Sequence, residues 1–449
     1  MIVLYMSTAL TYHKTVQCSS YKIFREVSLM KETMRGLNQG NIQNLNRSLL
    51  LNLLRREKVC ARTTLAEHSG LKQATVTHII NDFMNWNLVK EVGLLTGVKG
   101  RRSIAISLNT EDLAVAGIRI ARKDFSVGLF NLYGEAVMIR RTGIKHGQNA
   151  REIMDMVFRE MDKIIHQFPD KKILALGLAI PGPYNSVKGR ISVVTEVEGW
   201  ADIPLKDEFM EHYKIPVIIE EHANAAALAQ FWYSKETNNT DVLVYVAFAQ
   251  GIGAGIVNNG TLLKGSTGAA GEIGHTTIDI HGPRCSCGNY GCLERYCSSI
   301  TFVKKLNEAL GKKDELTFSD AVLLVKKENP IAVKLYMEMC DYLSIGIINV
   351  INSFNPRTIV IGDEMAHVNP NLMLERVISN VQKRIVPQTM ETTSIRLSSY
   401  KQDSMVYGAA IIAINDIFQN PAYYFSSDPD SEDTDDTLRS HFRNVRFPL

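Results

Sequence analysis

Hydrophobic and polar positions follow helical spacing near the start of the chain. Apolar residues recur every three or four positions in three segments, which short polar or glycine-containing turns separate. Two β-prone runs follow, on either side of a basic stretch rich in glycine. This order predicts a winged helix-turn-helix over residues 34–108. The expected helices are 42–57, 63–69 and 72–87, and the expected wing strands are 88–92 and 103–108.

From about residue 112 the pattern changes to apolar strands that alternate with helices, which predicts an α/β architecture. The series strand, turn, strand occurs twice, at 113–132 and at 241–260, and this repetition predicts two related lobes. The expected bounds are 112–235 for the first lobe, 236–402 for the second, and 403–420 for an apolar helix that completes the first.

The two ends of the chain lack these patterns. Residues 1–33 show no periodicity, and residues 421–449 are acidic and poor in apolar side chains, so both are predicted to be disordered. No apolar run approaches the roughly 20 residues that span a bilayer, and the start lacks the basic flank of a signal peptide. We therefore expect a cytoplasmic protein without membrane insertion.

The charge is distributed unevenly, although the net charge is only +3. The first 110 residues hold 15 Lys+Arg and 6 Asp+Glu, whereas the rest hold 35 and 41. A basic end favours a polyanion partner over a merely solvated basic face, and the predicted fold favours double-stranded DNA. Gln and Thr suit base edges, and Lys and Arg suit phosphates. The expected DNA contacts are Lys72, Gln73, Thr75, Thr77, His78, Arg101 and Arg102.

Four of the seven cysteines fall between residues 285 and 297. An odd, clustered set without a secretion signal favours a metal site over a disulfide framework. One imidazole and three thiolates fill a tetrahedral shell, as in structural zinc sites. The expected ligands are His275, Cys285, Cys287 and Cys292, with His281 and Cys297 as substitutes; ordinary buried thiols beside a core histidine are the alternative.

The segment GEIGH…CSCGNYGCLE, residues 271–294, resembles the zinc motif of the ROK family (repressors, open reading frames and sugar kinases). The resemblance covers about 40–420 and extends to the sugar-responsive repressors of that family. It implies a two-lobed, actin-like (ribonuclease H-like) sugar-kinase fold behind the DNA-binding domain, with structural zinc on the four residues named above. It also implies a sugar-binding cleft, to which we assign Glu221, His222, Glu272, His275 and Glu294.

The same resemblance indicates that the residues for phosphoryl transfer are lost. Where the family has the Asp that serves the metal of ATP, this chain has Arg119, and bulky side chains replace the glycines that follow. His222 occupies the position of the carboxylate base, so no catalytic residue is assigned. Further departures are Ala121, Arg122 and Lys123, Ala249-Gln250 before the GIGAGI loop at 251–256, and Asp363-Glu364 after Gly362.

These observations predict a repressor of carbohydrate-utilisation genes. It is expected to bind operator DNA as a dimer or tetramer and to respond to a sugar or sugar phosphate in the cleft. Two alternatives stay open at this point. The chain could be an active ATP-dependent sugar kinase with an added DNA-binding domain, or a protein partner could act on the zinc region in place of a sugar.

Overall fold

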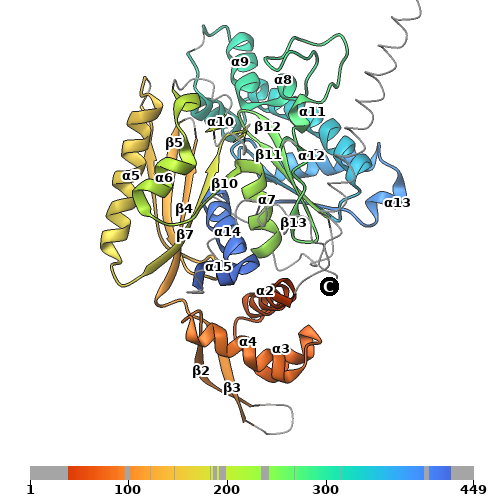
Figure 1. Ribbon diagram of the computed structural model, residues 1–449. Coiled ribbons are helices and arrows are strands. Elements are labelled where there is room, and N and C mark those ends of the chain that lie inside the picture. The colour runs from red at the N-terminus through yellow and green to blue at the C-terminus, as the bar shows by residue number, and fades with distance from the viewer. Residues whose placement is uncertain are drawn as a thin grey trace, which may run out of the picture.

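The computed structural model describes residues 39–96, 102–121, 123–145, 147–182, 184–185, 190–191, 199–233, 242–266, 268–313, 315–398 and 404–425. The predictions for residues 1–33, for Arg101 and Arg122, and for the chain beyond 425 lie outside these residues. Figure 1 shows a small N-terminal unit, residues 39–108, at one end of the molecule, with two larger lobes beyond it. We call this small unit the head.

The head consists of three helices and a small antiparallel sheet. The apolar stripe of its third helix is buried as predicted, with Val76, Ile80 and Phe83 fully inaccessible. Gly70 ends the second helix with φ of 69°, a left-handed conformation that glycine adopts without steric cost. The elements are α2 (Gln39–Glu57), β1 (Cys60–Ala61), α3 (Arg62–Ser69), α4 (Gln73–Asn85), β2 (Val89–Thr96) and β3 (Arg102–Leu108), with strand order β1-β3-β2.

The first lobe is built on a five-stranded sheet of order β10-β7-β4-β5-β6. The strand pairs β10-β7 and β7-β4 are parallel, and β4-β5 and β5-β6 are antiparallel. Helix α5 starts at a capping box between Asn149 and Glu152 and buries its apolar face on this sheet. The elements are β4 (Leu113–Ile120), β5 (Asp124–Phe130), β6 (Ala136–Gly143), α5 (Ala150–Gln167), β7 (Lys172–Ile180), β8 (Tyr184–Asn185), β9 (Arg190–Ile191), η1 (Trp200–Asp202), α6 (Leu205–Tyr213) and β10 (Val217–Glu221).

The second lobe repeats this sheet with order β13-β12-β11-β14-β15. Its pairs have the same directions as their counterparts, two antiparallel and two parallel, so the prediction of two related lobes is confirmed. The elements are β11 (Val242–Phe248), β12 (Ile252–Asn258), β13 (Thr261–Leu262), η2 (Ile273–His275), α8 (Glu294–Cys297), α9 (Ser299–Ala309), α10 (Phe318–Lys326), α11 (Pro330–Phe354), β14 (Thr358–Gly362), α12 (Pro370–Gln382), α13 (Pro387–Met390) and β15 (Ser394–Leu397).

Two helices, α7 (His222–Tyr233) and α14 (Ser404–Gln419), pack against each other between the lobes. Glycines allow their close approach to the sheets. A Cβ on Gly177 of β7 would overlap the carbonyl of Ala409, and one on Gly255 of β12 would overlap the carbonyl of Ala223. Helix α14 lies where the closing helix was expected, and it packs on β4 and β7 of the first-lobe sheet.

The chain continues past α14 into one further turn of helix, α15 (Pro421–Phe425). The Phe425 ring stacks on Trp86 of the head, with centroids 5.8 Å apart and an interplanar angle of 11°. The prediction of disorder was thus wrong for residues 421–425, where an aromatic residue of the head packs against the helical turn. Within the described residues, no helix combines the length and apolar character needed to cross a membrane.

Candidate functional site

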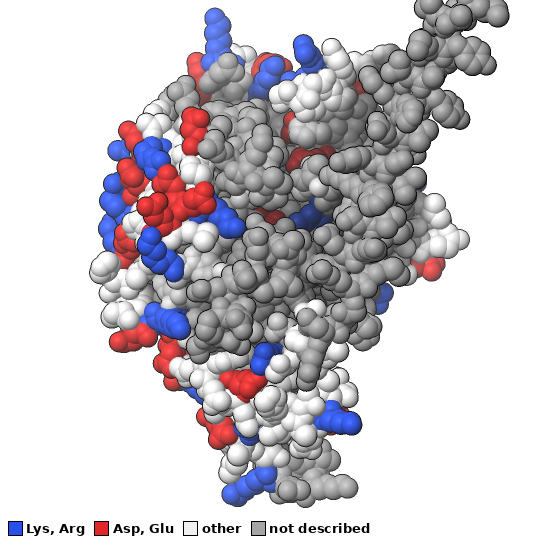
Figure 2. Space-filling view, in the orientation of Figure 1, with Lys and Arg blue, Asp and Glu red and all other residues white. Residues whose placement is uncertain are grey.

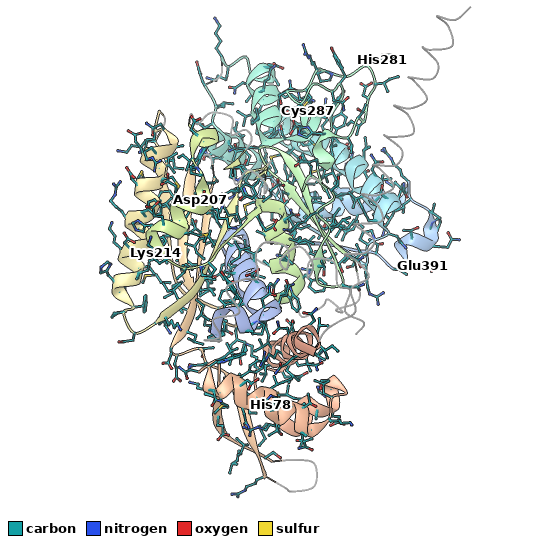
Figure 3. The ribbon with its side chains drawn as sticks, in the orientation of Figure 1. His78, Asp207, Lys214, His281, Cys287 and Glu391 are labelled. Carbon is teal, nitrogen blue, oxygen red and sulfur yellow. The ribbon has the colours of Figure 1, made fainter. Side chains whose placement is uncertain are left out.

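The four predicted metal ligands lie together at the outer end of the second lobe. Their candidate donor atoms all fall within 4.8 Å of one another. Cys285 Sγ is 3.7 Å from His275 Nδ1, and Cys287 Sγ is 3.7 Å from Cys292 Sγ. Figure 3 places Cys287 in this region, far from His78 of the head. Residues from three separate turns of the chain therefore form one compact donor set.

The chemistry of this donor set fits a tetrahedral cation. Three sulfurs and one imidazole nitrogen leave no open position, which is typical of structural zinc. Burial raises the pKa of Cys292 to about 12, and the neighbouring thiols add to this effect, so a thiolate at this position needs a cation beside it. The substitute ligands do not join the cluster. Cys297 is fully buried below it and donates toward the Leu293 carbonyl, and His281 is exposed.

Two carboxylates flank the cluster and contact His275 from different sides. Glu294 Oε1 lies 3.6 Å from His275 Nδ1 and 3.2 Å from Cys285 Sγ. Glu272 Oε2 lies 3.9 Å from Nε2 on the opposite side of the ring. Burial raises the pKa of Glu272, and the charge of Glu294 adds to this shift. The Nδ1 edge therefore faces the sulfurs, whereas the Nε2 edge faces a carboxylate that can bind a hydroxyl.

Glu221 extends this acidic surface from the first lobe. It ends β10, and its Oε1 accepts a 2.9 Å hydrogen bond from the backbone N–H of Tyr184. A Cβ on Gly182 would lie 2.9 Å from the Glu221 carboxyl carbon, so the Pro181-Gly182 turn packs directly against this carboxyl group. Burial raises the pKa of Glu221, and the charge of Glu272 raises it further. The carboxylates of Glu221 and Glu272, which belong to different lobes, are therefore near enough for their charges to repel each other.

The structure does not bring His222 into the same group of side chains. Its Nε2 lies 2.8 Å from the carbonyl oxygen of Ile120, at the end of β4. Loss of hydration lowers the pKa of His222 to about 3, and the charge of Arg119 adds to this effect. A neutral ring that donates to a backbone carbonyl links β4 to α7. The assignment of His222 to sugar binding stays a prediction.

The turn between β4 and β5 carries an ion pair at the place where the family is expected to bind nucleotide phosphates. Arg119 pairs with Asp124, and both side chains are largely buried, at 14% and 17% exposure. Asp124 also accepts from Arg141 Nε at 3.2 Å. Burial opposes ionisation of Asp124, but the two arginines hold its pKa below the usual range. This carboxylate is therefore engaged by protein cations.

The second-lobe departures are likewise engaged in internal hydrogen bonds. Glu364 accepts a 2.6 Å bond from the hydroxyl of Ser299, and Asp363 accepts a 3.1 Å bond from the hydroxyl of Tyr245. A Cβ on Gly251, the first residue of the GIGAGI loop, would lie 3.6 Å from Glu294 Oε2. The glycine-rich loop thus lies beside the predicted sugar side of the site.

One ion pair near Glu221 was missed by sequence reasoning. Lys264, in the loop after β13, pairs with Glu220 of β10, and the Glu220 side chain is only 10% exposed. The two residues are 44 positions apart and belong to different lobes, so no local pattern connects them. The pair ties the second lobe to the strand that carries Glu221.

The predicted DNA contacts lie on one helix and its flanking strand in the head. Lys72, Gln73 and His78 are exposed around the start of α4, and Thr75 and Thr77 are partly exposed. Thr77 Oγ1 donates to the Gln73 carbonyl at 2.8 Å within the helix. Arg102 is exposed at the start of β3, whereas Arg101 lies outside the described residues. Figure 2 shows Lys and Arg at the outer end of the head.

The profile of the ROK family matches residues 115–416, two thirds of the chain. The chain belongs to the ROK family. The xylose repressor of Bacillus subtilis is 30% identical over 381 residues, which cover 84% of this chain and 97% of the relative.

Two solved ROK structures are also similar to the chain. A ROK transcriptional regulator, a homologue of the E. coli MLC protein, has a TM-score of 0.71 at 24% identity and covers 84% of this chain and 97% of its own. A ROK hexokinase from Thermus thermophilus has a TM-score of 0.58 at 24% identity and covers 68% of this chain and 99% of its own. The two lobes therefore have the ROK sugar-kinase fold, and the regulator match extends over more of the chain than the kinase match.

Proposed function

We propose that this protein is a cytoplasmic DNA-binding repressor of carbohydrate-utilisation genes, and that a sugar in the cleft between the lobes releases it from its operator. The main support is the contrast between the two sides of that cleft. Glu221, Glu272 and Glu294 surround a position suited to hydroxyl groups, whereas Arg119 and Asp124 neutralise each other at the phosphate side. The near full-length similarity to a xylose repressor makes D-xylose the first sugar to test.

The head is proposed to be a winged helix-turn-helix. In this reading α4 enters the major groove, where Gln73, Thr75, Thr77 and His78 reach base edges. Lys72 and Arg102 contact phosphates, and the β2–β3 hairpin is the wing, together with Arg101. A dimer or tetramer would place two heads on half-sites about one helical turn apart, or a multiple of it.

His275, Cys285, Cys287 and Cys292 are proposed to hold one structural zinc ion. Zinc would supply a fixed point for the loop between residues 275 and 292 and perform no chemistry on the sugar. With Nδ1 toward the sulfurs, the His275 ring would present its Nε2 edge to Glu272. Carboxylates such as Glu272 accept paired hydrogen bonds from vicinal hydroxyls, which suits them to a carbohydrate.

The proposed DNA binding is tested by gel-shift titration on the segment upstream of the protein's own gene. We expect a specific complex whose affinity falls linearly with the logarithm of salt concentration. Lys72→Ala should reduce the magnitude of that slope by about 1, because one phosphate contact is lost. Lys383→Ala, which removes an exposed lysine of the second lobe, should leave the slope unchanged. Failure of the wild type to shift this DNA at low salt would contradict the proposal.

A second prediction concerns the cost of holding Glu221 in the cleft. The pKa of Glu221 in the fold lies above the unfolded value of about 4.3. The contribution of the protonated side chain to the free energy of unfolding is therefore fully present below about pH 4.3. It is lost as the pH rises through the folded pKa, because the buried carboxyl group then ionises. Glu221→Gln should therefore raise the melting temperature of the sugar-free protein at about pH 7.5 but not at about pH 4.

The same Glu221→Gln variant should bind the sugar more weakly, because an amide offers one acceptor oxygen where the carboxylate offers two. Glu391→Gln, at an exposed position on the edge of the second lobe (Figure 3), is the matched control and should not alter the melting temperature at either pH. Equal melting temperatures of Glu221→Gln and wild type at both pH values would show that ionised Glu221 does not destabilise the fold.

A further inference from the structure

Arg55 of the head lies where α2 meets both helices that pack between the lobes. Its guanidinium carbon is 3.7 Å from the ring centroid of Trp232 in α7 and 5.1 Å from that of Phe418 in α14. Its Nη1 also donates a 2.8 Å hydrogen bond to the side-chain oxygen of Asn415 in α14. Arg55 is only 7% exposed, so these contacts are shielded from water. Cation–π attraction is strongest in such a desolvated place.

The two helices that Arg55 contacts pack mainly on different lobes. Helix α14 packs mainly on β4 and β7 of the first lobe, with the backbone of Ala409 against Gly177, although its Ile411 and Ile412 also join a core with second-lobe strands. Helix α7 follows β10 but packs mainly on β11 and β12 of the second lobe, and its Gln230 donates a 2.8 Å bond to Ser398 just after β15. A rotation of one lobe relative to the other would therefore act on the α7–α14 interface, where Arg55 contacts both helices.

Helix α7 also connects this junction to the sugar side of the cleft. It begins at His222, directly after Glu221, and Trp232 lies ten residues further on, about 15 Å along a helix. A helix of this length transmits a displacement of its first turn to its last. Figure 1 shows α7 and α14 running from between the lobes toward α2.

The head itself is packed mainly on the first-lobe side. Leu50, Leu51 and Leu54 of α2 share one apolar core with Ile414, Ile417 and Phe418 of α14. The head therefore moves with α14, and the stacking of Arg55 on Trp232 adds a link to α7. That link is polar and directional, so a small slide of α7 weakens it while the apolar core stays intact.

We propose that Arg55 is a positioning residue that couples the sugar cleft to the DNA-binding head, by holding Trp232 of α7 against Phe418 and Asn415 of α14. This inference rests on the proposed function. Sugar-induced movement of the lobes changes the Arg55–Trp232 contact, and the head changes its orientation on the operator accordingly.

The test is the ratio of operator dissociation constants measured with and without D-xylose on the full-length protein. Allosteric effectors typically change affinity about 5- to 150-fold. Arg55→Lys keeps the charge but loses the planar face that stacks on Trp232 and the planar donor that bonds Asn415, so the wild-type ratio should fall by a factor of at least about 2, the lower end of what a cation–π contact supplies. Saturable binding of D-xylose without DNA should persist, since Arg55 lies outside the cleft.

Arg47→Lys is the matched control, because Arg47 stacks on Trp86 at 4.9 Å and pairs with Asp82, and both of these partners belong to the head. It should keep the wild-type ratio. If Arg55→Lys does not fold, Trp232→Leu and Trp232→Phe provide the same comparison: the leucine variant should lose the coupling, and the phenylalanine variant, which keeps a ring face, should retain most of it.

The outcomes distinguish this inference from the proposed function. A folded Arg55→Lys or Trp232→Leu protein with the wild-type ratio overturns the coupling role while the repressor proposal stands. A wild-type ratio of one with D-xylose, D-glucose and N-acetylglucosamine overturns the proposed sugar response, and the coupling role with it.

Discussion

Replacing Cys292 by alanine is expected to remove the bound metal and to abolish the response of operator binding to sugar. Cys292 is fully buried and supplies one of four donors that lie within 4.8 Å of one another. Structural zinc contributes about 10–16 kcal/mol of apparent binding free energy in zinc-finger peptides, and a tetrahedral site that loses a thiolate loses much of it. Without the ion, Glu272 and Glu294 are no longer held at either end of the loop.

Metal content per chain, measured by elemental analysis of the purified protein, is the first readout, and sugar-induced release from operator DNA is the second. Cys60→Ala is the control, since Cys60 is a buried cysteine of the head that lies outside the cluster. It should keep one metal ion per chain and the full sugar response. A Cys292→Ala protein with wild-type metal content and sugar response would refute the assignment of the site.

Much of the fold could be predicted because it rests on periodic burial. The stripe of α4 and the repeated strand, turn, strand pattern at 113–132 and 241–260 became buried elements at nearly the expected bounds. The metal cluster could be predicted for a different reason: three of its ligands lie within eight residues, so their spacing alone brings the sulfurs together.

Periodicity and motif spacing do not predict contacts between segments that are far apart in the sequence. Arg55 and Trp232 are 177 positions apart, and each looks locally like an ordinary helix residue. The turn of helix that ends at Phe425 was predicted as disordered because the acidic composition of residues 426–436 dominated the interpretation, whereas its order comes from stacking on Trp86.

His222 illustrates a further limit. Its position in the chain suggested a side chain that faces the sugar, because the family motif has a carboxylate base there. The geometry directs its Nε2 to the Ile120 carbonyl at the end of β4, next to the substituted Arg119. Two substitutions that looked independent in the sequence are thus neighbours in the fold.

We propose that the cleft keeps its sugar side while its nucleotide side is closed. The Arg119–Asp124 pair spans the turn where magnesium and phosphate would need a free carboxylate and bare backbone, and Asp363 and Glu364 add two carboxyl groups in the second lobe. A triphosphate would have to break a largely buried ion pair and approach these carboxylates. We therefore expect neither nucleotide binding nor phosphoryl transfer, with or without sugar.

The decisive measurement is calorimetric titration of the full-length protein with magnesium ATP, in the presence and absence of D-xylose. We expect saturable heat from D-xylose and none from magnesium ATP up to about 1 mM, the top of the usual KM range for enzyme substrates. We also expect no ADP in the recovered sample. Saturable binding of magnesium ATP, together with sugar-dependent release of ADP, would show that the nucleotide side is open.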